Sequence, residues 1–108
     1  MIYESRIYRC VPGRLPALLK RFETVTLKLF EKHGIRPAGF FTTLIGESNQ
    51  ELTYFLAWES LAERESRWTA FATDPEWLAA RAKSEEDGQI VANIVSQLLT
   101  PTAFSAMR

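Results

Sequence analysis

Polar and apolar residues alternate along the first ten positions of the chain. Residues 2–10, IYESRIYRC, are rich in Ile and Tyr, and every second residue of a strand points to the same face. The pattern therefore predicts a strand. One of its faces carries Ile2, Glu4, Arg6, Tyr8 and Cys10, and the other carries Tyr3, Ser5, Ile7 and Arg9.

After Pro12 and Gly13 the apolar residues recur every three or four positions, from Leu15 to Phe30. This spacing forms one apolar stripe and predicts a helix of about five turns. The helix should end at 31–34, EKHG, because cations complement the negative end of the helix dipole. Gly34 can adopt the left-handed conformation that often follows a helix.

Two runs rich in aromatic and β-branched residues follow, AGFFTTLI at 38–45 and ELTYFLAW at 51–58. The segment 46–50, GESNQ, has the composition and length of a hairpin connection. We expect the two runs to pair as antiparallel strands.

Ser60 and Glu63 match a helix capping box, so a second helix should begin near Leu61. Asp74 followed by Pro75 indicates that helical structure restarts there and carries residues 76–83. Polar residues 84–89 end this helix. The run 90–99 predicts a fourth strand.

The predicted order is strand, helix, strand, strand, helix, strand within a single domain, residues 1–108. This is the α+β ferredoxin-like order, a four-stranded antiparallel sheet with two main helices on one face. The other sheet face is then uncovered. We expect two faces of mixed polarity on this uncovered side. One is the face of the first strand that carries Glu4, Arg6 and Tyr8, and the other is a face of the last strand. Such faces suit a face-to-face homodimer enclosing a cavity, and the alternative is an exposed polar face on a monomer.

Composition narrows the possible partners. Thirteen basic residues balance thirteen acidic ones, which argues against nucleic acid as a partner. No apolar run is long enough for a membrane span and the N-terminus lacks the apolar core of a signal peptide, so we expect a cytoplasmic protein. Cys10 and His33 are each the sole residue of their type, and we predict neither a metal site nor a cofactor, haem included.

Several polar and aromatic residues are candidates for a cavity wall. Tyr54 and Trp58 share a face of the third strand, whereas Phe55 and Ala57 resemble helix-covered core. Glu4 and Arg6 should pair with each other or with a substrate, because a buried charge without a partner is costly. The full set of candidate ligand-binding residues is Glu4, Arg6, Tyr8, Tyr54, Trp58, Arg64, Trp77 and Asn93.

On the second helix, Arg64 shares a stripe with Trp68, so its stem should lie over apolar surface while its head reaches a carboxylate. Trp68 is assigned to the core. Trp77 either covers an opening or closes the helix restart. His33 is best explained as a cation at a helix end, and Cys10 as a small buried hydrophobe.

In this order, the segments IYESRIYRCVPGRLPALLKRFE, GFFTTLIGESNQ, WESLAER and DPEW resemble the NIPSNAP family of the dimeric α/β-barrel superfamily. The resemblance covers roughly residues 2–101. It implies a ferredoxin-like protomer whose sheet packs against that of a second subunit, forming a barrel with an interior cavity. Relatives in the superfamily include cofactor-independent monooxygenases, haem-degrading and chlorite-dismuting enzymes, and ligand-binding domains of regulators.

Two functional hypotheses follow. The first is a homodimer whose cavity binds a small, partly apolar molecule, with or without cofactor-independent monooxygenase-like chemistry in which Arg6 or Asn93 stabilises a developing anion. The second is a non-enzymatic protein-interaction module. The chain contains no catalytic triad, phosphate-binding glycine loop or dinucleotide motif, so no catalytic residue is assigned.

Overall fold

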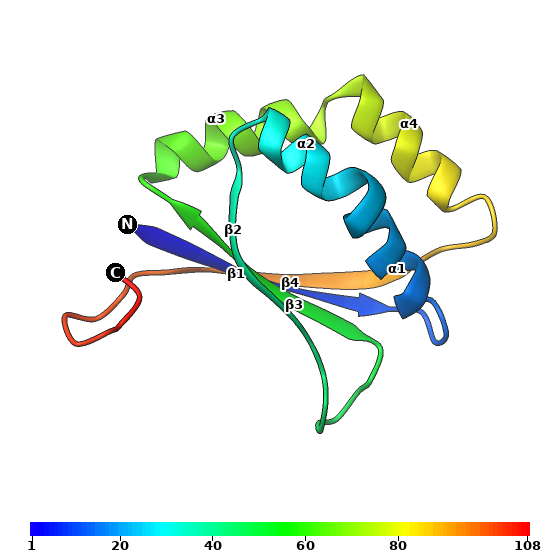
Figure 1. The fold of residues 1–108 in the computed structure, drawn as a ribbon, viewed down its shortest axis with the longest axis horizontal. Helices are drawn as coiled ribbons and strands as arrows, with labels where there is room; N and C mark the ends of the chain where they lie inside the picture. The colour runs from blue at the N-terminus through cyan, green and yellow to red at the C-terminus, as the bar shows by residue number, and fades with distance from the viewer.

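A four-stranded antiparallel sheet carries all of the helices on one of its faces (Figure 1). The structure is a computed structural model that describes residues 1–108. None of its helices is both long and apolar enough to cross a membrane. The elements, in chain order, are β1 (Ile2–Cys10), α1 (Leu15–Arg21), the π-helical turn η1 (Phe22–Thr26), α2 (Leu27–Lys32), β2 (Arg36–Thr42), β3 (Glu51–Trp58), α3 (Leu61–Ala72), α4 (Pro75–Ser84) and β4 (Val91–Leu99).

The strands lie in the order β2-β3-β1-β4, which confirms the predicted ferredoxin-like α+β fold. β1 is central, and its Arg6 lies opposite Tyr54 of β3 on one side and Ser96 of β4 on the other. β2 runs from Arg36 to Thr42, about two residues earlier than predicted. The early start includes Pro37, which an edge strand tolerates because one side of its backbone needs no ladder hydrogen bond.

The predicted five-turn helix is present, with one irregular turn in its middle. α1, η1 and α2 follow one another without a break, and in η1 the Leu27 N–H donates to the carbonyl of Phe22, five residues earlier. The helix ends as predicted: Gly34 has a φ of 70°. The Ile35 N–H then donates to the carbonyl of Phe30 at 2.8 Å, which satisfies a terminal carbonyl of the helix.

Both predicted caps of the second helical region are confirmed. The Glu63 N–H donates to Ser60 Oγ at 3.1 Å, and the Glu76 N–H donates to Asp74 Oδ1 at 2.8 Å. The Glu63 carboxylate does not complete the capping box. It accepts instead from Arg36 Nη2 at 3.1 Å and so ties α3 to the start of β2.

The face of β1 that carries Glu4, Arg6 and Tyr8 lies beneath the helices, so its assignment to the uncovered side was wrong. Tyr54 and Trp58 of β3 lie on this same covered side, and both are 0% exposed. The physical reason is that Glu4 and Arg6 meet enough polar partners inside the helix-covered layer to be buried there.

The opposite, uncovered face carries two residues that the sequence assigns to the helix-covered core. Phe55 and Ala57 of β3 lie there and are half-buried. The residues of β4 that pair with Tyr3, Ser5, Ile7 and Arg9 also lie on this side, namely Asn93, Val95, Gln97 and Leu99. The β4 face expected on the uncovered side is there for these four residues, whereas Val91, which shares that face by alternation, pairs with Cys10 beyond a register shift and packs against the core.

Candidate functional site

A buried carboxylate, that of Glu4, is the centre of a polar network between sheet and helices. It accepts hydrogen bonds from Arg6 Nη1 at 2.9 Å, Ser96 Oγ at 2.8 Å and Trp58 Nε1 at 3.1 Å. Arg64 Nε and Nη2 donate to its two oxygens at 2.9 and 3.2 Å. Burial alone would raise the pKa of Glu4, but the hydrogen bonds from Arg64, Ser96 and Arg6 lower it to about 2. Glu4 is thus a fully paired anion.

Arg6 links this network to a pair of tyrosines. Its Nε donates to Tyr54 Oη at 3.0 Å, its Nη2 lies 3.4 Å from Tyr8 Oη, and the two tyrosine hydroxyls are 3.0 Å apart. The Arg6 guanidinium also lies over the ring of Trp68, with 4.3 Å from Cζ to the ring centroid. Burial raises the pKa of Tyr54 well above its usual value. These contacts fix the guanidinium of Arg6 in one position.

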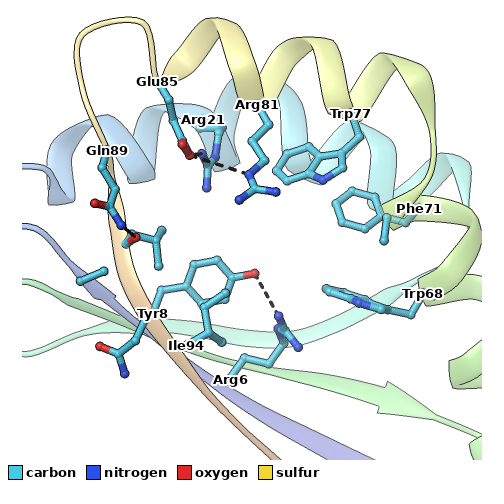
Figure 2. A pocket seen from close by; sticks show the side chains of 14 residues that line it. Arg6, Tyr8, Arg21, Trp68, Phe71, Trp77, Arg81, Glu85, Gln89 and Ile94 are labelled. Atoms are coloured by element: carbon cyan, nitrogen blue, oxygen red, sulfur yellow. Dashed lines mark hydrogen bonds and ion pairs between the residues drawn. The ribbon is translucent and has the colours of Figure 1, made fainter.

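A cavity of about 420 Å³ opens above Arg6 and Tyr8, between the sheet and α3 and α4. Its upper wall is aromatic: the ring centroids of Phe71 and Trp77 are 4.8 Å apart, and those of Trp68 and Phe71 are 5.2 Å apart. Figure 2 shows these rings projecting from the helical layer over Arg6 and Tyr8, which rise from the sheet. The cavity thus has a wall of closely packed aromatic rings and a polar floor.

One side of the cavity is charged. Arg21, the last residue of α1, has a side chain that is only 4% exposed, and its Nη1 lies 3.8 Å from Glu85 Oε1 and 3.3 Å from Ser84 Oγ. Arg81 Nε is 3.7 Å from the same oxygen of Glu85. The Nε atom of Arg21 has no hydrogen-bond partner. Burial lowers the pKa of Arg21, and the nearby carboxylate of Glu85 opposes that change.

The structure separates the predicted site residues into two groups. Arg6, Tyr8 and Trp77 line the cavity, whereas Asn93 borders it through β4 and its side chain lies on the uncovered face, beside that of Arg9. The other four do not line it and belong to the network beneath: Glu4, Tyr54, Trp58 and Arg64. The expected contact of Arg64 with a carboxylate and the expected pairing of Glu4 with Arg6 are both confirmed.

Other cavity residues were not predicted from the sequence. Trp68, assigned to the core, packs against the core and also lines the cavity. Arg21, Arg81 and Glu85 were not singled out, and neither was Phe71 as a ligand contact. The one sequence signal for them is the position of Arg21 directly beside Phe22 of the apolar stripe, which places a cation at the edge of the helix's buried face.

His33 and Cys10 lie outside the cavity. His33 follows the last residue of α2, and its Nε2 is 2.7 Å from Asp74 Oδ2, which also accepts from Lys32 Nζ at 2.8 Å. Hydrogen bonds from Lys32 and His33 hold the pKa of Asp74 well below its usual range. His33 therefore joins α2 to α4 and gives the cavity no axial ligand of the kind that haem proteins commonly use. Cys10 is buried, which raises the pKa of its thiol.

The fold and the helix-covered site define a ferredoxin-like α+β protein. A solved NIPSNAP family protein of unknown function from Agrobacterium tumefaciens is 30% identical, with a TM-score of 0.87, over 100% of this chain and 94% of that chain. An uncharacterised NIPSNAP domain protein from Burkholderia xenovorans is 25% identical, with a TM-score of 0.83, over 97% of this chain and 98% of that chain.

The model of the NIPSNAP family matches residues 3–106, and the chain belongs to this family, as the resemblance in its sequence indicated. A more distant structure, that of Rv0793 from Mycobacterium tuberculosis, has 16% identity and a TM-score of 0.61 over 94% of each chain, and it shows the shared fold alone. No curated protein matches the chain.

Proposed function

We propose that this NIPSNAP protein binds a small, partly apolar molecule in the cavity between its helices and its sheet. The observation that carries the proposal is the lining of this cavity, with packed aromatic rings on one side and guanidinium groups on the other. Its volume, about 420 Å³, lies within the range of roughly 300–1,000 Å³ that is usual for ligand pockets. An apolar wall with a few fixed polar groups is the usual composition of such a pocket.

The polar floor of the cavity is held in place before any ligand arrives. Arg6 has hydrogen bonds to Glu4 and Tyr54, and Glu4 is in turn bonded to Arg64 from the helical layer. A side chain locked by such a supporting layer loses little conformational freedom when it binds a ligand. Glu4, Tyr54 and Arg64 therefore act as positioning residues for Arg6 in this proposal.

The proposed assembly is a homodimer through the uncovered sheet face. That face carries apolar side chains from all four strands, among them Ile7, Phe41, Phe55 and Val95, and Phe41 is 58% exposed. An exposed apolar surface of this kind favours a partner over solvent. The resemblance to the NIPSNAP family implies a barrel formed by two such sheets, which supports a second copy of the chain as that partner.

A second candidate function is cofactor-independent oxygenation of the bound molecule, favoured by the fixed guanidinium of Arg6 in the cavity floor. Loss of a proton from an activated methylene would leave a carbanion that the Arg6 guanidinium stabilises. Oxygen then adds to that carbon, the proton returns to the peroxide, and loss of water gives the ketone: R₂CH₂ + O₂ → R₂C=O + H₂O. The substrate supplies all four electrons, so no external reductant is needed.

Ligand binding is tested by thermal stabilisation with a panel of small aromatic and aliphatic molecules, because a ligand that binds only the folded state raises its stability. Compounds that stabilise the wild type should stabilise Trp77→Ala less. Leu44→Ala is the matched control, since Leu44 is an apolar side chain in the β2–β3 loop that is 94% exposed.

Oxygen uptake by chelator-treated protein, with a compound that binds, tests the oxygenation candidate.

Absence of any stabilising compound for the folded wild type would contradict the binding proposal. An equal response of wild type and Trp77→Ala to every compound would place the binding elsewhere. The first result would leave the protein-interaction module, for which the exposed Leu44 and Ile45 provide an apolar surface.

A further inference from the structure

We propose that the molecule bound in this cavity is an aromatic carboxylate, whose carboxylate group displaces Glu85 from Arg21 and Arg81. This inference rests on the proposed function and specifies the chemical class of the ligand. It depends on three features of the site: its excess positive charge, the incompletely bonded Arg21, and the position of Glu85.

The cavity concentrates positive charge in a chain that has none overall. Three arginines line it, Arg6, Arg21 and Arg81, against a single acid, Glu85. Glu4 balances Arg6 from beneath, but Arg64 shares that carboxylate as well. The thirteen basic and thirteen acidic residues of the chain cancel, so this local excess is a property of the site. An anionic ligand would reduce the repulsion among these guanidinium groups.

Arg21 is buried without a full set of partners. Its Nε is the one buried side-chain nitrogen or oxygen in the structure that lacks a hydrogen bond. Its contact with Glu85, at 3.8 Å, is longer than a hydrogen bond. A buried donor without an acceptor costs free energy, and guanidinium groups bind carboxylates through two parallel N–H donors. A ligand carboxylate at Arg21 would supply the acceptor that Nε lacks.

Glu85 marks where such a carboxylate fits. Its Oε1 lies between the two cations, 3.8 Å from Arg21 Nη1 and 3.7 Å from Arg81 Nε (Figure 2). Glu85 follows the last residue of α4 and is the first of three turn residues, 85–87, that lead to Gly88, whose φ is 124°. Because Glu85 is attached at a helix end and makes only these long contacts, it can give way to a better-placed anion.

The aromatic part of the ligand is inferred from the neighbouring rings. Arg21 Cζ lies 5.4 Å from the ring centroid of Trp77, which packs against Phe71. A ring attached directly to the carboxylate would therefore contact the aromatic wall while its oxygens bind Arg21. Offset and edge-to-face contacts between such rings are favourable.

The test compares 2-naphthoate with its neutral analogue 2-naphthamide by isothermal titration calorimetry. The wild type should bind the acid roughly tenfold or more tightly than the amide, since hydrogen bonds to charged groups are the stronger ones. Arg21→Met should weaken binding of the acid to the level of the amide. Glu85→Gln should strengthen binding of the acid several-fold and leave the amide unchanged, because the competing carboxylate is removed. Lys28→Gln, which removes an exposed cation on α2, should change neither.

Arg81→Gln is the second variant, needed because Arg21 is buried and its replacement can unfold the chain. The side chain of Arg81 is 57% exposed, so its removal leaves the core intact, and it too should weaken the acid selectively. Equal binding of acid and amide to the wild type would overturn the carboxylate proposal and leave the binding function standing. Binding of neither compound would count against both. Weaker binding of the acid to Glu85→Gln would overturn the displacement of Glu85.

Discussion

Arg64 of α3 donates two hydrogen bonds to the carboxylate of Glu4 in β1, at 2.9 Å from Nε to Oε1 and at 3.2 Å from Nη2 to Oε2. The two residues are 60 positions apart in the chain. Arg6, Ser96 and Trp58 donate to the same carboxylate. The helical layer is therefore attached to the centre of the sheet by a buried ionic network as well as by apolar packing.

Glu4→Gln should destabilise the protein strongly. The substitution keeps the size of the side chain but removes the charge that balances Arg6 and Arg64. Breaking a buried ion pair by removing one partner costs about 3–5 kcal/mol, and the free energy of unfolding at pH 7 should fall by that amount in urea denaturation. Glu47→Gln removes an exposed carboxylate in the β2–β3 loop and should change stability by less than about 0.5 kcal/mol.

The same carboxylate should make stability depend on pH in the acid range. Its pKa in the folded protein is about 2, below the ordinary value of 4.5. A depressed folded-state pKa contributes stability that is fully present above pH 4.5 and is lost as the pH falls towards 2. At about 1.4 kcal/mol per pKa unit, the loss is about 3 kcal/mol. The difference in stability between wild type and Glu4→Gln should therefore shrink between pH 5 and pH 2, and a constant difference would contradict this role.

Replacing Trp58 should mainly lower stability, whereas replacing Trp77 should mainly weaken ligand binding. Trp58 is 0% exposed and donates to Glu4, so Trp58→Ala should cost about 3–5 kcal/mol of unfolding free energy. Trp77 is half-buried and lines the cavity, so Trp77→Ala should cost roughly 1–2 kcal/mol but weaken ligand binding. Urea denaturation and the thermal-shift panel measure the two effects. A larger loss of stability in Trp77→Ala than in Trp58→Ala would contradict the assignment.

The elements of this fold could be predicted because their signals are local. Ser60 and Asp74 cap helices through their own side chains, and Gly34 ends a helix through its own backbone conformation. The covered face of β1 could not be predicted in this way. Alternation shows which residues share a face, but the partners that allow Glu4 to be buried, Trp58 and Arg64, come from distant segments.

The charged side of the cavity could not be predicted for a related reason. Arg81 lies in α4 and Glu85 directly follows that helix, four residues later, a spacing typical of a solvent-exposed ion pair. The pair becomes part of the cavity wall through its contact with Arg21 of α1. Arg21 approaches Glu85 only once α1 and α4 have packed on the same face of the sheet. The π-helical turn that begins directly after Arg21 also has no signal in the sequence.

Gly34→Ala should destabilise the end of α2. Gly34 has a φ of 70°, which costs other L-residues roughly 1–2 kcal/mol, and a methyl group there would overlap the Arg67 guanidinium. Because Arg67 is flexible, most of the cost should come from the backbone. Gly34→Asn should therefore be milder than Gly34→Ala, since Asn adopts this conformation more readily. Thermal unfolding measures both variants, and an equal loss for both would show that the contact with Arg67 dominates.

The protein should be a homodimer at micromolar concentration, held together through the uncovered sheet face. Phe55 lies in the middle of that face, with its ring centroid 6.4 Å from that of Phe41, so a charge at this position would be buried without a partner in a face-to-face dimer. Light scattering should give the wild type twice the mass of one 12.4 kDa chain and should give Phe55→Lys the mass of a single chain. Leu78→Lys places the same charge on α4, on the helical side of the sheet, and should remain dimeric. A monomeric wild type, or a Phe55→Lys variant that stays dimeric, would show that the uncovered face is not the interface.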